Sequence, residues 1–303
     1  SPEMVLSDLG RAIEEHFYKI SKFTPEIEVL GVQIMPEHLH GVLRVKRAMS
    51  KPLGEHLRGF KMGATKIARE AGVLSSIHAG DARGFGLFAD GFVDTILFDD
   101  IAIQKALNYI QDNPRRLFEK RAHPELFRVL RDFEWRLPNE GPVLHFAAIG
   151  NLSLLKTPQI LQVQCSRHYF SYKRQSDGTL DKDAPPAYMT VEFKEKLETL
   201  LAAASHGAVL ISPCISQGEK EIARQAFKAG FRVITLSNKG FSPLYKPGGK
   251  LFDQCVAGNL LMLAPAAWPY LPGEKKITRM DACVLNRIAQ LLAGDGAVEI
   301  DYK

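Results

Sequence analysis

The spacing of apolar residues in the first 75 positions predicts alternating helices and strands. Residues 5–20 have helical spacing, and apolar runs at 27–35 and 38–47 have the length of strands. In residues 52–72, apolar side chains recur every three to four positions, which predicts a long helix. The basic residues of that helix lie off the apolar stripe, as on a solvated face.

Two further elements complete the first part of the chain. A strand is expected to end in VDTILF (residues 93–98), and a helix to begin at a capping Asp and to end at Pro114. Paired strands with covering helices predict a small α+β sandwich.

The second part has the pattern of a parallel sheet. AVLIS (208–212) and FRVITLS (231–237) flank a helical segment, which predicts a strand–helix–strand unit. Ser216 and Glu219 form an S-x-x-E capping box, and Gly230 is placed to end the helix. We expect an α/β Rossmann-like domain here.

The polar segment RLPNEGP marks the expected boundary between the two parts. We predict a first domain over residues 1–135, a linker over 136–156 and a second domain over 157–303. A chain of 303 residues is long enough to form two domains.

Composition narrows the class of protein. No apolar run approaches the roughly 20 residues needed to span a bilayer, and SPEMVLSDLG does not have the pattern of a secretion signal. Cys165, Cys214, Cys255 and Cys283 are far apart and are expected to be buried thiols. Together these features predict a cytoplasmic protein without a membrane partner.

The net charge of +5 is distributed unevenly. Residues 1–135 carry 19 Lys and Arg against 19 Asp and Glu, whereas residues 136–303 carry 20 against 15. Any diffuse attraction to a polyanion is therefore expected from the second half.

Two histidines give the first hint of chemistry. On a strand, His38 and His40 would point to the same face, and Leu39 and Leu43 to the other. Two imidazoles can share one divalent ion, but Mg²⁺ or Mn²⁺ needs further donors. H-x-H alone is a weak motif, so chance, a structural pair and two metal ligands all stay open.

The helix that ends near Pro114 offers the further donor. Tyr109 and Asn113 are four residues apart and share one helical face. A tyrosine beside a metal suggests phosphoryl transfer, in which the phenol oxygen attacks phosphorus. The alternative is a tyrosine at the rim of the core followed by a C-terminal asparagine.

Four ordered motifs carry a resemblance over residues 5–120. IMPEHLHGVL, LRGFKMGATKIA, LFADGFVDTIL and YIQDNP resemble the single-tyrosine HUH transposases, above all the REP-associated tyrosine transposases. The resemblance implies a ferredoxin-like sheet, in which His38 and His40 bind a divalent metal with Asn113 as third ligand. It also implies Tyr109 as the nucleophile that cuts single-stranded DNA, leaving a 5′-phosphotyrosine, and Lys61 as a basic residue near the DNA.

The chain departs from that family at its start. The family's domain opens with a strand ahead of the first helix, and this chain begins directly at the helix. We therefore expect the first strand of the sheet to be missing.

A looser resemblance covers residues 157–295. LQVQCSRHY and VLISPCISQGEKEIARQAFKAG resemble the Rossmann-like fold of DNA-processing protein A and of lysine-decarboxylase-like nucleotide phosphoribohydrolases. The turn after a parallel strand favours an anion, which here predicts a DNA or phosphate site. The candidate residues are Ser166, Arg167, Ser212, Ser216 and Gly218.

These patterns support one main function and two alternatives. The main prediction is a metal-dependent single-stranded DNA endonuclease and strand transferase, acting on single-stranded or hairpin DNA; a homodimer stays open. The first alternative is a catalytically degenerate or domesticated DNA- or nucleotide-binding protein. The second is a nucleotide-processing enzyme, which is disfavoured because paired glutamates do not follow the Pro-Gly-Gly turn in YKPGGKLFDQ.

Overall fold

The computed structural model describes residues 4–74, 86–273 and 275–294. The chain forms two compact units, Ser1–Glu119 and Lys120–Lys303. The segment expected as a linker, residues 136–156, lies within the second unit: residues 137–142 form the turn of a β-hairpin that belongs to that unit's sheet. The segment contains Pro and Gly because the chain turns there. A tight turn and a domain boundary have the same composition, so the sequence alone does not distinguish them. Among the described residues, no helix has the length and apolarity to cross a bilayer.

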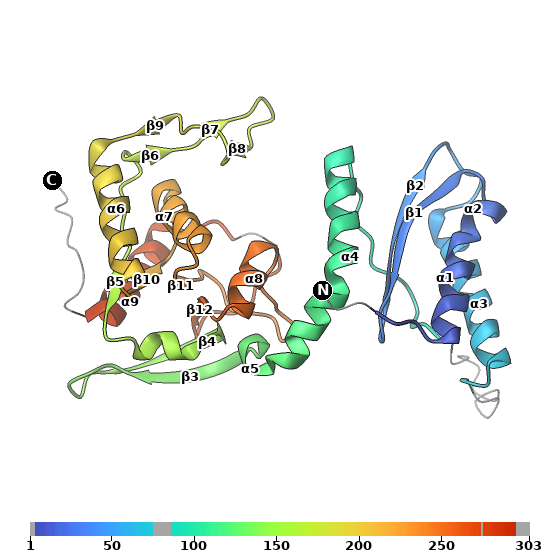
Figure 1. The fold of residues 1–303 in the computed structure, drawn as a ribbon, viewed down its shortest axis with the longest axis horizontal. Coiled ribbons are helices and arrows are strands. Elements are labelled where there is room, and N and C mark those ends of the chain that lie inside the picture. Colours follow the sequence, from blue (N-terminus) through green and yellow to red (C-terminus); the bar gives the residue numbers. More distant parts are fainter. Residues whose placement is uncertain (1–3, 75–85, 274, 295–303) are drawn as a thin grey trace. The chain divides into compact units, whose positions relative to one another are not determined.

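The first unit combines one β-hairpin with helices (Figure 1). Its elements are α1 (Asp8–Tyr18), α2 (Ile20–Phe23), β1 (Ile27–Ile34), β2 (Leu39–Val45), α3 (Leu53–Glu70) and α4 (Asp100–Ala122). β1 and β2 are antiparallel, with Ile34 opposite Leu39 and Gln33 opposite His40.

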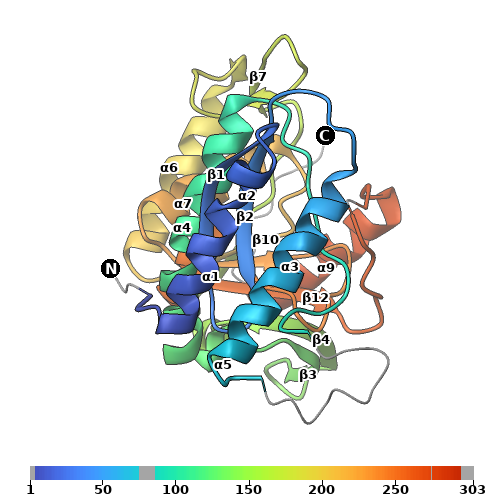
Figure 2. The same cartoon turned by 90° about the vertical axis from the view of Figure 1, so that its right-hand side faces the viewer.

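The two faces of this hairpin are covered by different helices. A Cβ on Gly41 would lie 2.3 Å from Cζ of Phe17 in α1, and a Cβ on Gly31 would lie 2.9 Å from Cδ2 of Leu107 in α4. Figure 2 looks onto α1 and α3, which lie side by side over the Gly41 face. The core between them is apolar and includes Phe17 and Phe60. Strand alternation therefore separates a face covered by α1 and α3 from a face covered by α4.

Three expectations for the first unit need correction. VDTILF is not a strand: Val93 is 100% exposed and Phe98 is 90% exposed. α4 does not end at Pro114 but continues to Ala122, because Pro114 removes only one intrahelical hydrogen bond from a long helix. With only two strands among the described residues of this unit, the structure does not show the ferredoxin-like sheet.

The second unit is built on a mixed six-stranded sheet of order β3-β4-β12-β11-β10-β5. β5, β10, β11 and β12 are parallel, and β4 and β3 are added in antiparallel orientation. The strands are β3 (Leu130–Arg136), β4 (Val143–Gly150), β5 (Ile160–Gln162), β10 (Val209–Ser212), β11 (Val233–Leu236) and β12 (Leu260–Pro265). The expected parallel α/β core is therefore present, with an antiparallel extension.

The remaining elements of the second unit are helices and small ribbons. The helical ones are α5 (Pro124–Phe127), the 3-10 helix η2 (Leu152–Lys156), α6 (Val191–Ser205), α7 (Gln217–Lys228), α8 (Lys250–Val256) and α9 (Arg279–Ala293). The strands β6 (Phe170–Ser171) and β9 (Tyr188–Met189) form one pair, and β7 (Lys173–Arg174) and β8 (Leu180–Asp181) form another.

Both faces of the second sheet are buried. On β10, Val209 and Ile211 pack into the core that contains Leu285 of α9. Leu210 points the other way, into the core that contains Phe193 of α6. A strand covered on both faces is expected to be apolar throughout, which explains the run AVLI.

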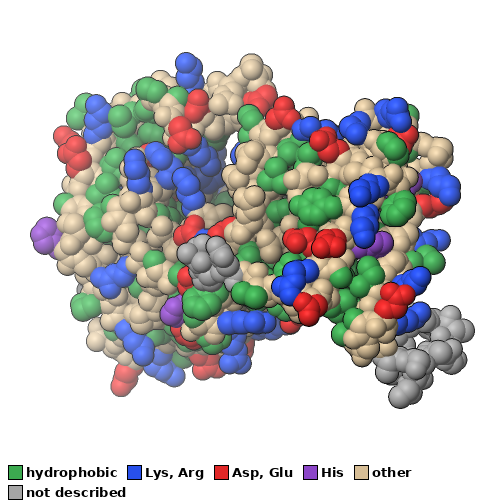
Figure 3. All heavy atoms as spheres, turned by 45° about the vertical axis from the view of Figure 1, so that its right-hand side comes forward, with side chains coloured by type: hydrophobic (Ala, Val, Ile, Leu, Met, Phe, Trp, Pro, Cys, Tyr) green, Lys and Arg blue, Asp and Glu red, His purple; other side chains and the backbone are tan. Residues whose placement is uncertain are grey.

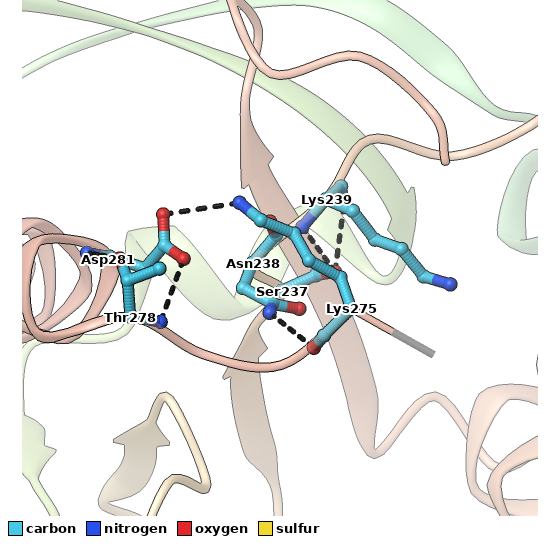
Figure 4. Close-up of polar contacts among 6 residues, drawn as sticks. All are labelled: Ser237, Asn238, Lys239, Lys275, Thr278 and Asp281. Atoms are coloured by element: carbon cyan, nitrogen blue, oxygen red, sulfur yellow. Dashed lines mark hydrogen bonds and ion pairs between the residues drawn. The ribbon is translucent and has the colours of Figure 1, made fainter. Parts of the chain in front are cut away.

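The loops that follow β11 and β12 are tied together at the carboxyl edge of the sheet (Figure 4). Asn238 donates to the carbonyl of Lys275, whose Nζ donates to the Asn238 carbonyl and to Asp281. Asp281 also accepts from the backbone N–H of Thr278, the N-cap of α9. These bonds fix the start of α9 relative to β11.

The four cysteines are free thiols, but they are not all buried. Cys165 and Cys255 are buried, Cys214 is half-buried and Cys283 is exposed on α9. Burial raises the pKa of Cys165 to about 11, so this thiol is protonated at neutral pH.

The close contact at Gly41 gives a stability prediction. Gly41→Ala should lower the free energy of unfolding by about 1–3 kcal/mol, because the added methyl group overlaps the buried Phe17 ring. Gly59→Ala in α3 is the matched control, since a Cβ there meets nothing within 4 Å; it should raise the free energy of unfolding by up to about 1 kcal/mol. Urea denaturation followed by circular dichroism measures both, and equal stability of Gly41→Ala and wild type would contradict the packing.

Candidate functional site

His38, His40 and Tyr109 form one cluster, named here the imidazole–tyrosine cluster. His38 immediately precedes β2 and His40 lies within it; their ring centroids are 4.8 Å apart at an interplanar angle of 87°. The Tyr109 ring of α4 lies 5.9 Å from the His40 ring, at 82°. A strand and a helix separated by some sixty residues thus bring the three predicted side chains together.

Tyr109 is accessible and contacts a cation. Its side chain is 41% exposed, and Cζ of Arg116 lies 5.5 Å from the ring centroid. Arg116 itself is only 9% exposed, and its Nε donates to Asp112 Oδ2 at 2.9 Å. A guanidinium over an aromatic face is an attractive arrangement, and it holds the ring in place while part of the residue stays exposed. Sequence reasoning missed Arg116, although its spacing of seven residues from Tyr109 places it on the same helical face.

Asp112 holds two arginines at this end of the cluster. Arg115 donates to Oδ1 at 2.6 Å and to Oδ2 at 2.9 Å, beside the bond from Arg116. The hydrogen bond from Arg115, followed by that from Arg116, lowers the pKa of Asp112 against the opposing effect of burial. The carboxylate therefore stays ionised and keeps Arg116 against Tyr109.

Asn113 is the candidate third metal ligand. It is 7% exposed, lies one turn after Tyr109, and its Nδ2 is buried without a hydrogen-bond partner. An amide presents oxygen in place of nitrogen when it rotates by half a turn, so this position suits an oxygen donor. The described residues contain no group of three or more His, Cys, Asp or Glu side chains that could hold a metal. The two imidazoles are therefore the donors that the structure brings together in this cluster, and Asn113 as third ligand stays a prediction.

Lys61 has a local structural task. Its Nζ donates to the carbonyls of Ala89, at 2.8 Å, and of Gly91. The ammonium group thus ties the segment that leads toward α4 to helix α3. The expected position next to DNA remains a prediction.

A second candidate lies at the carboxyl ends of β5 and β10. It is a hollow of about 210 Å³, lined by Arg167, Phe170, Ser171, Ile215, Ser216 and Gln217. Neighbouring parallel strands end at the same sheet edge, and this brings Arg167 and Ser216 to one hollow.

The other predicted phosphate-binding residues are engaged in the fold. Ser212 is fully buried and its Oγ accepts from the N–H of Cys214 at 3.0 Å. A Cβ on Gly218 would lie 2.4 Å from Cys165 Sγ, so Gly218 permits close helix packing. Ser166 accepts weakly from the N–H of His168 at 3.3 Å.

A buried carboxylate occupies the start of α7. Ser216 caps the helix by accepting from the N–H of Glu219 at 3.1 Å, as the capping box predicts. The carboxylate of Glu219, however, accepts from the N–H of Ile215 at 2.7 Å. Burial raises the pKa of Glu219, against the opposing effect of these backbone bonds. One N–H that a phosphate would use is therefore already satisfied, which leaves Arg167 as the cation of the hollow.

Comparisons with known proteins give distant likenesses. No family model matches the sequence. An uncharacterised protein of Haemophilus influenzae is 24% identical over 132 residues, which cover 37% of this chain and 68% of that protein.

Two solved structures of DNA processing protein A are similar. That of Helicobacter pylori, described for its single-stranded DNA binding mode, is 18% identical with a TM-score of 0.34 and covers 55% of this chain. That of Streptococcus pneumoniae is 19% identical with a TM-score of 0.35 and covers 64% of this chain. The chain spans 65% and 60% of the lengths of these two proteins.

The buried Glu219 gives a pH-dependent stability prediction. Its folded pKa lies above the ordinary value of 4.5, so the proton binds more tightly in the folded state. That stabilisation is complete below the unfolded pKa and is lost as pH rises through the folded pKa. Glu219→Gln keeps an acceptor for the Ile215 N–H and does not ionise, so its stability relative to wild type should rise between pH 4.5 and 8. The gain should be on the order of 1 kcal/mol per unit of pKa shift.

The measurement is urea denaturation of wild type and variant at both pH values. Glu198→Gln, at an exposed site on α6, controls for the loss of one charge. A difference between Glu219→Gln and wild type that does not vary with pH would show that Glu219 titrates alike in both states.

Proposed function

We propose that this chain binds single-stranded DNA and that the imidazole–tyrosine cluster is the part that contacts a phosphodiester. The observation that carries the proposal is the convergence of His38, His40 and an exposed Tyr109. Exposed aromatic rings and arginine are the groups on which unpaired bases and phosphates are held. Arg116 packs on the same ring.

In its catalytic form, the cluster cuts the strand. The Tyr109 oxygen attacks phosphorus, the new O–P bond replaces the bond to the 3′ oxygen, and a 5′-phosphotyrosine and a free 3′-OH result. His38, His40 and Asn113 would hold Mg²⁺ or Mn²⁺, which polarises the phosphate oxygens. Arg116 positions the Tyr109 ring.

The second candidate is DNA binding without cleavage. Two observations favour it: the donor set has only two imidazoles with an amide, and the sheet that carries them has two described strands. In this form His38 and His40 act as hydrogen-bonding and stacking groups. Formation of a covalent adduct distinguishes the two forms.

The second unit supplies the diffuse attraction to the strand. Residues 1–119 carry 15 Lys and Arg against 16 Asp and Glu, whereas residues 120–303 carry 24 against 18. On the right-hand part of Figure 3, which draws the first unit, basic and acidic side chains are interspersed. Counterion release from DNA should therefore depend mainly on the second unit, with Arg167 at its hollow contacting a phosphate.

The catalytic form predicts a covalent intermediate. Wild type incubated with single-stranded hairpin DNA and Mn²⁺ should give an adduct that survives denaturing electrophoresis, and Tyr109→Phe should give none. Folding of the variant should change little, because an exposed hydroxyl contributes about 1 kcal/mol or less. Tyr188→Phe, at another exposed tyrosine, is the control and should leave the adduct unchanged.

Binding of the metal that the catalytic form requires is tested by isothermal titration calorimetry. His38→Ala combined with His40→Ala should abolish Mn²⁺ binding, and Asn113→Ala should weaken it. Unchanged Mn²⁺ binding in the double variant, or an undiminished adduct in Tyr109→Phe, would exclude these roles. DNA binding without any adduct would favour the second candidate.

Arg167 gives a prediction about salt dependence. Arg167→Ala should lower DNA affinity similarly for different sequences and flatten the slope of log K against log salt by roughly one unit per lost phosphate contact. Fluorescence anisotropy of the full chain across a salt series measures both. Arg287→Ala, on α9 and outside the hollow, is the matched control. An equal slope for Arg167→Ala and wild type would remove Arg167 from the DNA site.

A further inference from the structure

Helices α1 and α3 of the first unit lie side by side and meet at a histidine (Figure 2). The His16 ring of α1 stacks on Phe60 of α3, with centroids 5.5 Å apart and an angle of 22°. A Cβ on Gly63 of α3 would lie 2.1 Å from Nε2 of His16. The absence of a side chain at Gly63 therefore makes the room that the imidazole fills. We name this arrangement of His16, Phe60 and Gly63 the α1–α3 contact.

The α1–α3 contact fits a neutral imidazole better than a charged one. Within the described part of the chain, Nε2 of His16 is buried and has no hydrogen-bond partner. A neutral imidazole carries a proton on one nitrogen only, whereas a charged imidazole carries one on each. In the charged form, the N–H at Nε2 would be buried without an acceptor, in addition to the cost of burying the charge. Protonation of His16 therefore opposes the contact.

The charges around His16 act in the same direction. Burial lowers the pKa of His16 against the opposing effect of the Phe60 carbonyl, and the positive charge of Lys19 lowers it further. On the α3 side, the titratable groups that line the hollow next to His16 are the exposed Glu55 and His56. The His16 ring is therefore neutral at physiological pH.

His56 is a second imidazole between these elements, but its surroundings differ. Its Nδ1 lies 2.9 Å from Thr24 Oγ1, and its Nε2 is also buried without a partner. The pKa of Glu26 is lowered by its own backbone N–H, by Arg47 and, least, by the charge of His56. A charge on His56 thus has a carboxylate to interact with, whereas a charge on His16 meets another positive charge. His16 is therefore the ring whose protonation is more costly.

We infer that the α1–α3 contact is a pH-sensitive device: protonation of His16 in mild acid loosens α1 from α3 while the second unit stays folded. Phe17, the next residue of α1, packs on Gly41 of β2. Loosening of α1 therefore also uncovers the strand that carries His40. The device does not depend on whether the imidazole–tyrosine cluster binds or cuts DNA.

The direction of the pH effect follows from the lowered pKa of His16. Because the folded pKa lies below the ordinary value of 6.5, the open form binds the proton more tightly. The stability of the contact is complete above pH 6.5 and is lost as pH falls through the folded pKa. Each pH unit between the two pKa values favours the open form by up to about tenfold. The second unit responds in the opposite direction, because the pKa of its buried Glu219 is raised.

Hydrogen exchange of the full chain at pH 7.5 and 5.5, corrected for the intrinsic exchange rate, tests the inference. Protection of the α1 and α3 amides should fall about three- to tenfold between the two pH values. Protection of the α6 amides in the second unit should stay equal or rise. Unchanged protection of α1 and α3 would overturn the inference. A fall of equal size in both units would overturn it too, because it would indicate general acid unfolding.

Variants identify the group that titrates. His16→Leu should reduce the fall in protection to less than twofold. Lys19→Gln, at an exposed position, keeps the ring and removes the neighbouring charge, so it should reduce the fall even if His16→Leu does not fold. Lys22→Gln, at an exposed lysine of α2, is the matched control and should behave as wild type. If the fall keeps its size in Lys19→Gln but disappears in His56→Gln, the inference is wrong, because His56 is then the titrating group.

Discussion

The close approach of α4 to β1 at Gly31 is the contact on which the imidazole–tyrosine cluster depends. A Cβ on Gly31 would lie 2.9 Å from Leu107 Cδ2 and 3.5 Å from Ile110 Cδ1, so glycine leaves room for these two side chains of α4 against the hairpin. Ile110 is buried by this packing. The helical period then places Tyr109 at the edge of the contact, next to His40. The geometry of the cluster is thus a consequence of apolar packing between a helix and a hairpin.

The sequence predicted those features that follow from a local period. Strand alternation placed His38 and His40 on one face, and helical spacing placed Tyr109 and Asn113 together on α4. It could not predict that VDTILF forms no strand. Residues with high β-propensity form a strand only where they pack beside a neighbouring strand, and whether that neighbour is present depends on the whole fold. The helix beyond Pro114 was missed because Pro114 removes only one hydrogen bond, and side-chain contacts within α4 span that position, from Arg116 to Asp112 and to Tyr109.

The start of α7 also contains a residue, Glu219, whose contacts the sequence pattern could not predict. The motif S-x-x-E correctly indicated the cap by Ser216, but not that the Glu219 carboxylate also accepts from the N–H of Ile215. Glu219 is buried because α7 packs closely at Gly218 on Cys165 and Phe193. A phosphate at this helix end therefore competes with an internal carboxylate, which the sequence pattern alone does not reveal. Lys196, whose ammonium donates to the Gln164 carbonyl and attracts Glu219, helps to keep that carboxylate in place.

The connection between α3 and α4 explains why packing, and not the chain path, determines the position of Tyr109. Lys61 and Thr65 hold residues 87–91 against α3, and Asp99 caps the start of α4 through the N–H of Ala102. Between these anchors, the described residues 93–98 pair with no strand and expose apolar side chains. A segment fixed only at its ends constrains a following helix weakly. The position of α4 is therefore set mainly by its own contacts with the hairpin, among them the packing of Leu107 and Ile110 at Gly31, rather than by the bonds of Lys61.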